Sequence, residues 1–207
     1  MICAPTACSS SPVRAGAAQC LQQHPSVGGK DEVMTPAGFP RSLPRPKPIT
    51  PKAGQESVWD YPRPPRVESR SERVVVRLGG EVIADTSGAV RVLETSHPPV
   101  YYLPIEAFVD GALRPVEGTS FCEFKGEAHY FDVLGGGAVA ARAAWNYPEP
   151  ARGFDALGPR IALYPGQMDS CEIDGERVTS QVGDFYGGWI TTNIVGPFKG
   201  PPGTMGW

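Results

Sequence analysis

The sequence predicts an all-β protein built of antiparallel sheets, with one or two short helical turns and a long proline-rich N-terminal arm. Glycine and proline are frequent, with 25 and 23 residues among 207, and both residue types favour turns over long helices. From residue 73 onward, short apolar runs alternate with glycine turns, which is typical of antiparallel strands. No stretch of about 18 apolar residues occurs, so a membrane is not expected as a partner.

Residues 1–54 are predicted to form an arm that precedes a domain spanning residues 55–207. The first 30 residues are rich in Ala, Ser, Gln and Cys and contain no acid, a composition typical of an organelle transit peptide. A disordered extension and a true start at Met34 are open alternatives. Prolines between residues 35 and 55 favour an extended linker. We therefore expect a cytoplasmic protein, or one of the plastid stroma if residues 1–30 are a transit peptide.

Charge is distributed unevenly along the chain. Residues 1–55 carry six Lys or Arg and two acidic residues, whereas residues 56–207 carry 13 basic and 20 acidic residues. Because phosphate contacts need a basic surface, nucleic acid is not expected as a partner of the acidic domain. The five cysteines show no C-x-x-C spacing. A structural zinc ion is therefore not expected, and no particular cofactor is indicated.

The strands of the domain follow from apolar runs and the turns between them. Residues 74–76 and 81–85 flank a Gly-Gly pair, which predicts a β-hairpin with Val82 and Ala84 directed inward. A helical turn is predicted after Pro104. Further strands are predicted at residues 89–93, 100–103, 120–124, 128–134, 138–145, 161–164, 171–173 and 177–178, the last two joined by an Asp-Gly turn.

The stretch of residues 121–130 concentrates the chemistry of the domain. It contains Cys122, Lys125 and three aromatic residues. In an extended strand, Ala128 and Tyr130 share one face. We expect any functional site to lie around this stretch.

Aromatic residues recur outside this stretch. The pattern Trp-polar-Tyr-Pro occurs at residues 59–62 and again at residues 145–148. Such large side chains are expected to pack against the domain, where they either close its ends or stack on a ligand. Near the C-terminus, Phe185, Tyr186 and Trp189 are expected to fold back over the domain, because disordered tails are poor in aromatic residues.

The sequence resembles the family of domain of unknown function 427 in four blocks, at residues 94–102, 122–130, 144–148 and 162–164. The resemblance covers residues 56–207. Within the family, the sequence is similar to a branch found in photosynthetic bacteria and algae. It implies a β-tent fold, shared with methionine sulfoxide reductase B and the thalidomide-binding domain of cereblon. Those relatives fix the tent with paired C-x-x-C motifs, which this sequence lacks. The nucleotidyltransferase label sometimes given to the family would require paired Asp residues for two-metal chemistry, and that motif is also missing.

Four polar residues are candidates for catalysis. Cys122 is a nucleophile if Lys125 or His97 lowers its pKa, and otherwise a small buried residue. His97 is a general base or a turn residue that bonds to the backbone. Glu94 and Lys125 form either an acid–base pair or an ordinary ion pair. The candidate ligand-binding residues are aromatic, namely Tyr101, Tyr102, Tyr130, Trp145 and Tyr147.

Three hypotheses of function follow from these residues. The first is a small-molecule-binding domain, which as an enzyme would act through the polar and aromatic pocket around Cys122 and Lys125. The second is a non-enzymatic module that binds a peptide or a cyclic ligand, and the third is a structural or assembly protein. Convergence of Glu94, Lys125 and Cys122 on one cavity would favour the first hypothesis. An aromatic cage without polar groups would favour the second, and a flat apolar surface the third.

Overall fold

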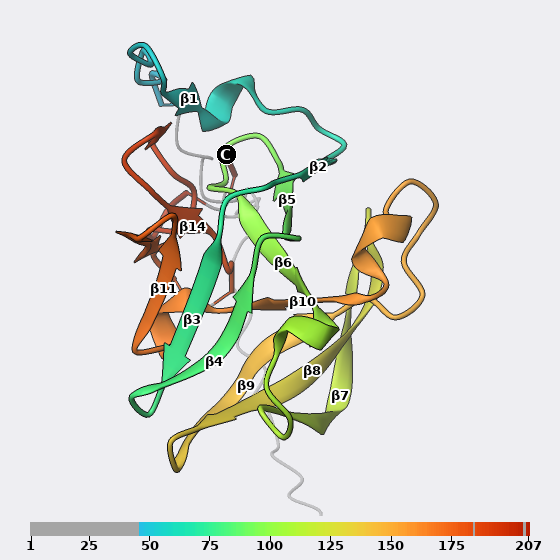
Figure 1. The fold of residues 1–207 in the computed structure, drawn as a ribbon. Helices are drawn as coiled ribbons and strands as arrows, with labels where there is room; N and C mark the ends of the chain where they lie inside the picture. Colours follow the sequence, from blue (N-terminus) through green and yellow to red (C-terminus); the bar gives the residue numbers. More distant parts are fainter. Residues whose placement is uncertain (1–45, 184, 205) are drawn as a thin grey trace, which may run out of the picture. The chain divides into compact units, whose positions relative to one another are not determined.

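The computed structural model describes residues 46–183, 185–204 and 206–207 (Figure 1). These residues form four β-sheets, none of which closes into a barrel, and the predicted all-β fold is confirmed. The helical segments are four short 3-10 turns, η1 (Val58–Asp60), η2 (Ile105–Ala107), η3 (Asp155–Leu157) and η4 (Pro165–Gln167). Within the described ranges, no helix is long and apolar enough to cross a membrane. Residues 1–45 lie outside the described residues, so the predicted boundary after residue 54 stays a prediction.

The largest sheet has seven strands, and every neighbouring pair in it is antiparallel. In spatial order these are β2 (Arg66–Ser69), β5 (Val90–Leu93), β6 (Val100–Pro104), β10 (Arg160–Leu163), β9 (Ala138–Asn146), β8 (Gly126–Gly135) and β7 (Leu113–Cys122). The strands β7, β8 and β9 follow one another in a meander, and Figure 1 shows them as the longest ribbons of the sheet.

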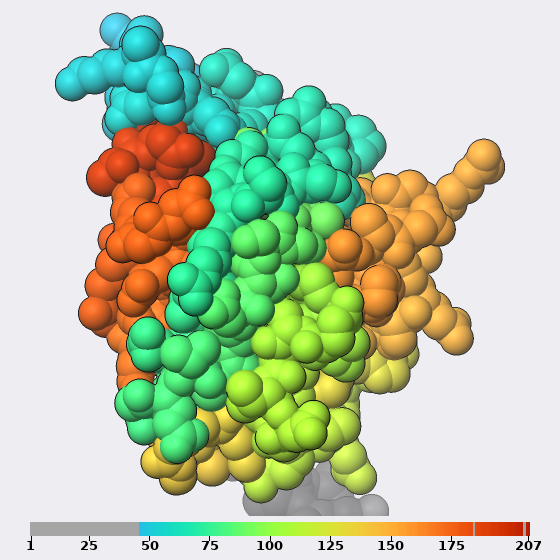
Figure 2. Space-filling view, viewed as in Figure 1, coloured from blue at the N-terminus to red at the C-terminus, as the bar shows by residue number. Residues whose placement is uncertain are grey.

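A second sheet covers one face of the first. Its four strands are, in order, β12 (Glu176–Arg177), β11 (Ser170–Ile173), β3 (Val74–Leu78) and β4 (Glu81–Thr86). In Figure 2 the orange segment that contains β11 lies alongside the green hairpin of β3 and β4. Two small sheets complete the fold, the parallel pair of β1 (Glu56–Ser57) with β15 (Ile194–Val195) and the antiparallel pair of β13 (Thr179–Ser180) with β14 (Trp189–Ile190).

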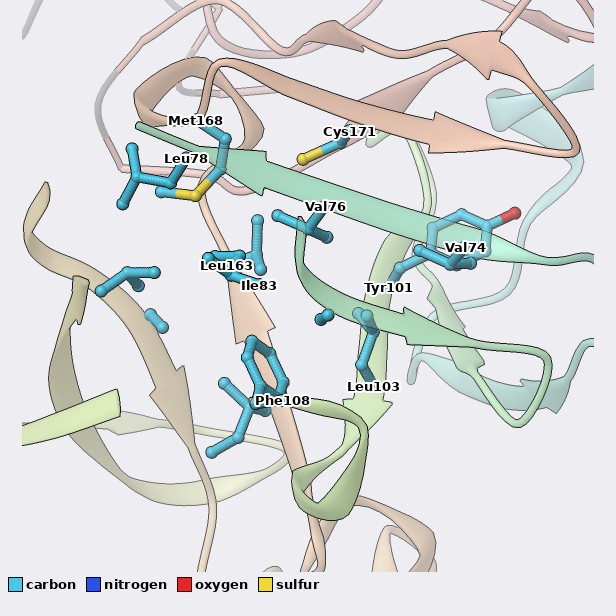
Figure 3. Packing of buried hydrophobic residues seen from close by; sticks show 14 of the residues in the cluster. Val74, Val76, Leu78, Ile83, Tyr101, Leu103, Phe108, Leu163, Met168 and Cys171 are labelled. Carbon is cyan, nitrogen blue, oxygen red and sulfur yellow. The ribbon is translucent and has the colours of Figure 1, made fainter. Parts of the chain in front are cut away.

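The seven-stranded sheet buries side chains on both of its faces. On β6, Tyr101 and Leu103 join the core that is shared with the four-stranded sheet (Figure 3). The residue between them, Tyr102, points to the opposite face and joins a second apolar cluster. On β10, Ile161 and Ala162 divide between the two clusters in the same way. The alternation of side chains along these two strands therefore supplies two cores from one sheet.

The predicted hairpin of β3 and β4 is present, but its inward face differs from the prediction. The pairing shifts between Val76 and Arg77, so that β4 carries one extra residue. Because of this bulge, Ile83 and Ala84 are both buried, whereas Val82 is only half-buried. The predicted inward position of Val82 is therefore wrong, and Ile83 occupies it.

Strand β7 starts earlier and ends sooner than the sequence predicted. It begins at Leu113 and includes Pro115, a residue that normally interrupts strands. Proline is tolerated here because β7 is the edge strand of the sheet. The strand ends at Cys122, so Phe124 lies in the turn to β8 rather than in the strand.

The described aromatic residues near the C-terminus divide into buried and exposed ones. Trp189 is fully buried on β14 and packs on Tyr101, with ring centroids 5.2 Å apart. Tyr186 is half-buried. Phe185 is 76% exposed, so the expectation that it packs on the domain is wrong.

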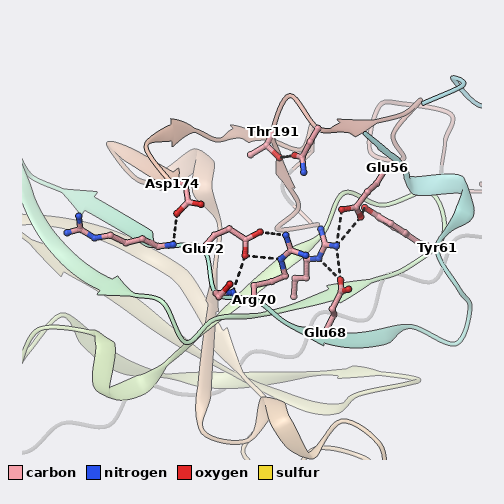
Figure 4. A network of polar contacts seen from close by, with 11 residues as sticks. Glu56, Tyr61, Glu68, Arg70, Glu72, Asp174 and Thr191 are labelled. Atoms are coloured by element: carbon pink, nitrogen blue, oxygen red, sulfur yellow. Dashed lines mark hydrogen bonds and ion pairs between the residues drawn. The ribbon is translucent and has the colours of Figure 1, made fainter. Parts of the chain in front are cut away.

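A buried arginine ties the first strands of the domain together. Arg91 on β5 is 3% exposed and donates to Glu68 on β2 at 2.8 Å and to Glu56 on β1 at 3.0 Å. The Tyr61 hydroxyl donates to the same Glu56 carboxylate at 3.0 Å. Figure 4 shows Glu56 and Glu68 directed into this network, with the Tyr61 hydroxyl directed at Glu56. Burial, reinforced by Glu56, raises the pKa of Tyr61 well above its ordinary value, so the hydroxyl keeps its proton.

Replacing Arg91 with Met should destabilise the domain by roughly 2 kcal/mol, because the variant leaves two carboxylates without their shared cation. The partners are partly exposed, and water therefore recovers some of the loss. The matched control is Arg73→Met, since Arg73 forms an exposed pair with Asp85 at 2.5 Å. Urea unfolding of both variants tests the prediction. Equal stability of the two variants would contradict it.

Two neighbouring glycines in the turn between β3 and β4 provide a second test. Both have a positive φ, +60° at Gly79 and +78° at Gly80. A Cβ at Gly79 would lie 2.2 Å from the carbonyl oxygen of Gly135, whereas one at Gly80 meets nothing within 4 Å. Gly80→Ala should therefore lose only about 1–2 kcal/mol from the left-handed backbone. Gly79→Ala should lose about 1–3 kcal/mol more of folding stability, because the turn at Gly79 must move away from the turn at Gly135. Thermal unfolding of both variants measures the difference.

Candidate ligand-binding cavity

A cavity of about 310 Å³ lies on the face of the seven-stranded sheet opposite to the four-stranded sheet. Its floor is formed by side chains of β5, β6, β8 and β9 that share that face, such as Tyr102, Ala128 and Trp145. The end of the β7–β8 hairpin forms one wall, with Cys122 and Lys125. Residues from the loop after β5 and from the C-terminal segment form the rest.

Aromatic rings dominate the cavity. The ring centroids of Tyr102 lie 6.3 Å from Trp145 and 6.4 Å from Tyr147. Trp145 also contacts Tyr164, at 4.6 Å between centroids. Tyr130 lines the same space. Four of the five aromatic candidates, Tyr102, Tyr130, Trp145 and Tyr147, therefore line one cavity.

Tyr101 does not line this cavity. It lies next to Tyr102 on β6, so its side chain points to the opposite face of the sheet, into the core around Trp189. Its assignment to the ligand-binding set is corrected accordingly. A single step along a strand separates a residue of the cavity from a residue of the core.

The predicted pair of Glu94 and Lys125 does not form. Glu94, with its side chain 18% exposed, instead accepts a hydrogen bond from Arg63 at 2.5 Å. Arg63 also binds Glu123 at 2.8 Å and lies over the ring of Phe124, 5.0 Å from its centroid. This arginine therefore joins the loop after β5 to the tip of the β7–β8 hairpin.

Lys125 is the cation of the cavity that has no ionic partner among the described residues. Its Nζ atom lies 6.0 Å from the centroid of the Tyr147 ring. No carboxylate within the described ranges lies at ion-pairing distance from its Nζ atom. Glu94 and Glu123, which line the same cavity, both bind Arg63. The ammonium group is thus available to a ligand that brings a negative charge or an acceptor.

His97 is held in a tight turn. Its backbone N–H donates to the backbone carbonyl oxygen of Glu94 at 3.0 Å, and Ser96 before it has a φ of 71°. Its Nδ1 lies 3.0 Å from the carbonyl oxygen of Thr95. A carbonyl oxygen only accepts, so Nδ1 carries the proton and Nε2 is an acceptor. Burial lowers the pKa of His97 below its ordinary value, although the Glu94 carboxylate opposes this effect.

Among the described residues, no histidine or carboxylate is hydrogen-bonded to Cys122. It is the half-buried last residue of β7. Nε2 of His97 has no hydrogen-bond partner among the described residues, so the expected pairing of this histidine with the thiol is absent.

Burial, together with the neighbouring Tyr102 and Cys122, raises the pKa of Tyr147. Burial also raises the pKa of Tyr164 to about 12, so both tyrosines face the cavity as neutral hydroxyl groups.

The C-terminal segment lies directly on the cavity wall. A Cβ at Gly187 would approach Cη2 of Trp145 to 2.3 Å, so this position requires glycine. The residue before it, Tyr186, meets the His97 ring edge-on, with 4.6 Å between the ring centroids. Both residues line the cavity. The chain after β13 therefore completes a site that the central strands begin.

Sequence reasoning missed Arg63, Tyr164 and Tyr186 as parts of this site. Tyr164 was detectable, because it lies two residues after Ala162 in the predicted strand of residues 161–164, and residues two apart share a face. Arg63 was not, since nothing local links it to an acid 31 residues away. Among the described residues, no group of three His, Cys, Asp or Glu side chains is placed to hold a metal ion.

The fold and the cavity define a mainly β domain with one aromatic-walled site. The chain belongs to the family described as domain of unknown function (DUF427), whose model matches residues 66–174, more than half of the chain. The resemblance to this family is thereby confirmed over residues 66–174, whereas the photosynthetic branch stays a prediction. The matched range includes most of the cavity but neither Arg63 nor the segment around Tyr186. No curated protein matches the sequence.

The lowered pKa of His97 predicts how stability depends on pH. The unfolded chain binds the proton more readily than the folded one, so stability should decrease as the pH falls below the unfolded value of 6.5. His97→Gln removes this titration. The stability advantage of wild type over the variant should therefore be largest above about pH 7 and shrink by about pH 5. Thermal unfolding across this range tests the prediction, and a constant difference would contradict it.

Proposed function

We propose that this domain binds a small, flat organic ligand in the aromatic cavity. The observation that carries the proposal is a cavity of about 310 Å³ in which nine of the 21 lining residues are Phe, Tyr or Trp. Ligand sites in proteins commonly measure about 300–1,000 Å³ and have this composition. The cavity is at the lower end of that range, which favours a compound of one or two rings over a larger one.

The polar groups support a ligand with an acidic or acceptor group. Lys125 has no carboxylate partner within the described ranges, whereas Glu94 is already neutralised by Arg63. A cation close to low-dielectric aromatic walls attracts an anion more strongly than it would in open water. A carboxylate attached to a flat ring would satisfy Lys125 and the aromatic surfaces together.

Binding accounts for the site better than catalysis by Cys122 does. Nucleophilic catalysis needs a base within hydrogen-bond reach of the nucleophile. Among the described residues, no hydrogen bond joins Cys122 to His97 or to Glu94. The proposal therefore assigns Cys122 to the wall of the site.

A thermal-shift screen against aromatic carboxylic acids tests this function. A compound present at about 100 times its Kd should raise Tm by roughly 5–10 °C, because it binds only the folded state. Lys125→Met keeps the length of the stem and removes the charge, so the variant should fold and lose the shift. The matched control is Lys52→Met, at an exposed lysine outside the cavity, which should keep the shift. A screen without hits, or hits that survive in Lys125→Met, would contradict the proposal.

A peptide ligand is the second candidate, and two exposed aromatic residues favour it. Phe121 is 79% exposed and Phe185 is 76% exposed, and both border the cavity. Exposed aromatic side chains are common at sites where proteins bind one another. The double variant Phe121→Ser/Phe185→Ser separates the candidates. Small-molecule binding should survive these changes, whereas peptide binding should be lost.

A further inference from the structure

One arginine joins two walls of the cavity. Arg63 donates to Glu94 in the loop after β5 at 2.5 Å and to Glu123 at the tip of the β7–β8 hairpin at 2.8 Å. Its guanidinium carbon also lies 5.0 Å from the centroid of the Phe124 ring. Glu94, Glu123 and Phe124 all line the cavity. These contacts, called the Arg63 clamp below, therefore hold the hairpin tip against the loop.

The loop wall is anchored independently of the clamp. The Thr95 hydroxyl donates to the backbone carbonyl oxygen of Tyr61 at 2.6 Å. The backbone carbonyl oxygen of Ser96 accepts a hydrogen bond from the backbone N–H of Lys199 at 2.9 Å. Arg63 lies only two residues after Tyr61, so the arginine and the loop wall are fixed to the same part of the domain.

The hairpin tip is held less firmly than the loop. The Glu123 side chain is 67% exposed, whereas that of Glu94 is 18% exposed. Water and salt weaken an exposed ion pair more than a partly buried one. Among the described residues, the hydrogen bonds and ion pairs that connect the tip at residues 123–125 to the loop at residues 94–97 all pass through Arg63. The bond between Arg63 and Glu123 is therefore the part of the clamp that breaks first.

We infer that the Arg63 clamp controls entry to the cavity. On its other side, the tip is attached to the loop after β9, because the backbone N–H of Ala151 donates to the carbonyl oxygen of Lys125 at 3.0 Å. When Glu123 is released, the tip moves away from the loop about this attachment and the cavity opens between the two walls. The inference goes beyond the proposed function, since it applies to any compound that enters the cavity.

Labelling of Cys122 with N-phenylmaleimide tests the inference on the full-length protein. Cys122 is half-buried and lines the cavity, and the reagent is an uncharged flat molecule on which salt does not act directly. Peptide mapping by mass spectrometry separates Cys122 from the other four cysteines. Cys171 is 2% exposed in the core and reports unfolding of the whole domain.

Salt should open the clamp in the wild-type protein. Raising NaCl from about 0.1 M to about 1 M shortens the Debye length from about 10 Å to about 3 Å. Labelling of Cys122, normalised to a free thiol under the same conditions, should become about 1.4- to 5-fold faster, as expected for the release of one exposed ion pair. Labelling of Cys171 should not change.

Variants of Arg63 should have the same effect without salt. Arg63→Gln removes both ion pairs, so labelling of Cys122 at low salt should be about 2- to 25-fold faster than in wild type and should no longer depend on salt. Arg63→Lys keeps the charge but lacks the planar fork that binds two carboxylates, so its rate should be intermediate. The matched control is Arg73→Gln, which removes an exposed pair with Asp85 outside the cavity and should behave as wild type.

The outcomes separate this inference from the proposed function. Labelling of Cys122 that responds neither to salt nor to Arg63→Gln would overturn the inference and leave the proposed function standing. If Arg63→Gln also accelerates labelling of Cys171, the variant unfolds the domain, and the salt series on wild type decides alone. Because the test uses no ligand of the cavity, a screen of aromatic acids without hits would overturn the proposed function but not the clamp.

Discussion

The alternation of side chains along β6 and β10, two central strands of the seven-stranded sheet, is the constraint on which the rest of the structure depends. On β6, Tyr101 and Leu103 enter the core beneath the four-stranded sheet, and Tyr102 between them enters the cavity. A register shift of one residue would exchange the two faces. Because both faces are buried, such a shift would move Tyr102 into the core beneath the four-stranded sheet and Leu103 into the cavity.

Polar side-chain contacts hold this register and build the polar side of the cavity. Arg91 joins β1, β2 and β5 through Glu56 and Glu68, so the strand before the cavity loop is fixed at its base. The same loop then turns sharply at Ser96 and brings His97 against the C-terminal segment. The apolar sheet thus sets the position of the cavity, and charged groups at its edge set the chemistry of the cavity.

The sequence predicted the strands well where turn residues and apolar alternation agreed, as in the hairpin of β3 and β4. It failed where tertiary contacts decide the conformation. The bulge that buries Ile83 arises because Val76 pairs with Ala84 and Arg77 pairs with Val82. Pro115 is permitted because the order of the strands places β7 at the edge of the sheet. For the site, Tyr102, Tyr130, Trp145 and Tyr147 were named from the sequence and line the cavity, whereas Tyr101, also named, lies on the opposite face. The partner of Glu94 was not, because Arg63 reaches it from a segment 31 residues away.

The central claim is that the face of the sheet that carries Tyr102 and Trp145 forms a binding site, and intermolecular nuclear Overhauser effects test it most directly. With an aromatic carboxylic acid from the screen bound, the account predicts contacts from the ring protons of the compound to those of Tyr102 and Trp145. No contact to Tyr101 is expected, because it lies on the opposite face. Contacts to Tyr101, or none to either cavity ring, would contradict the account.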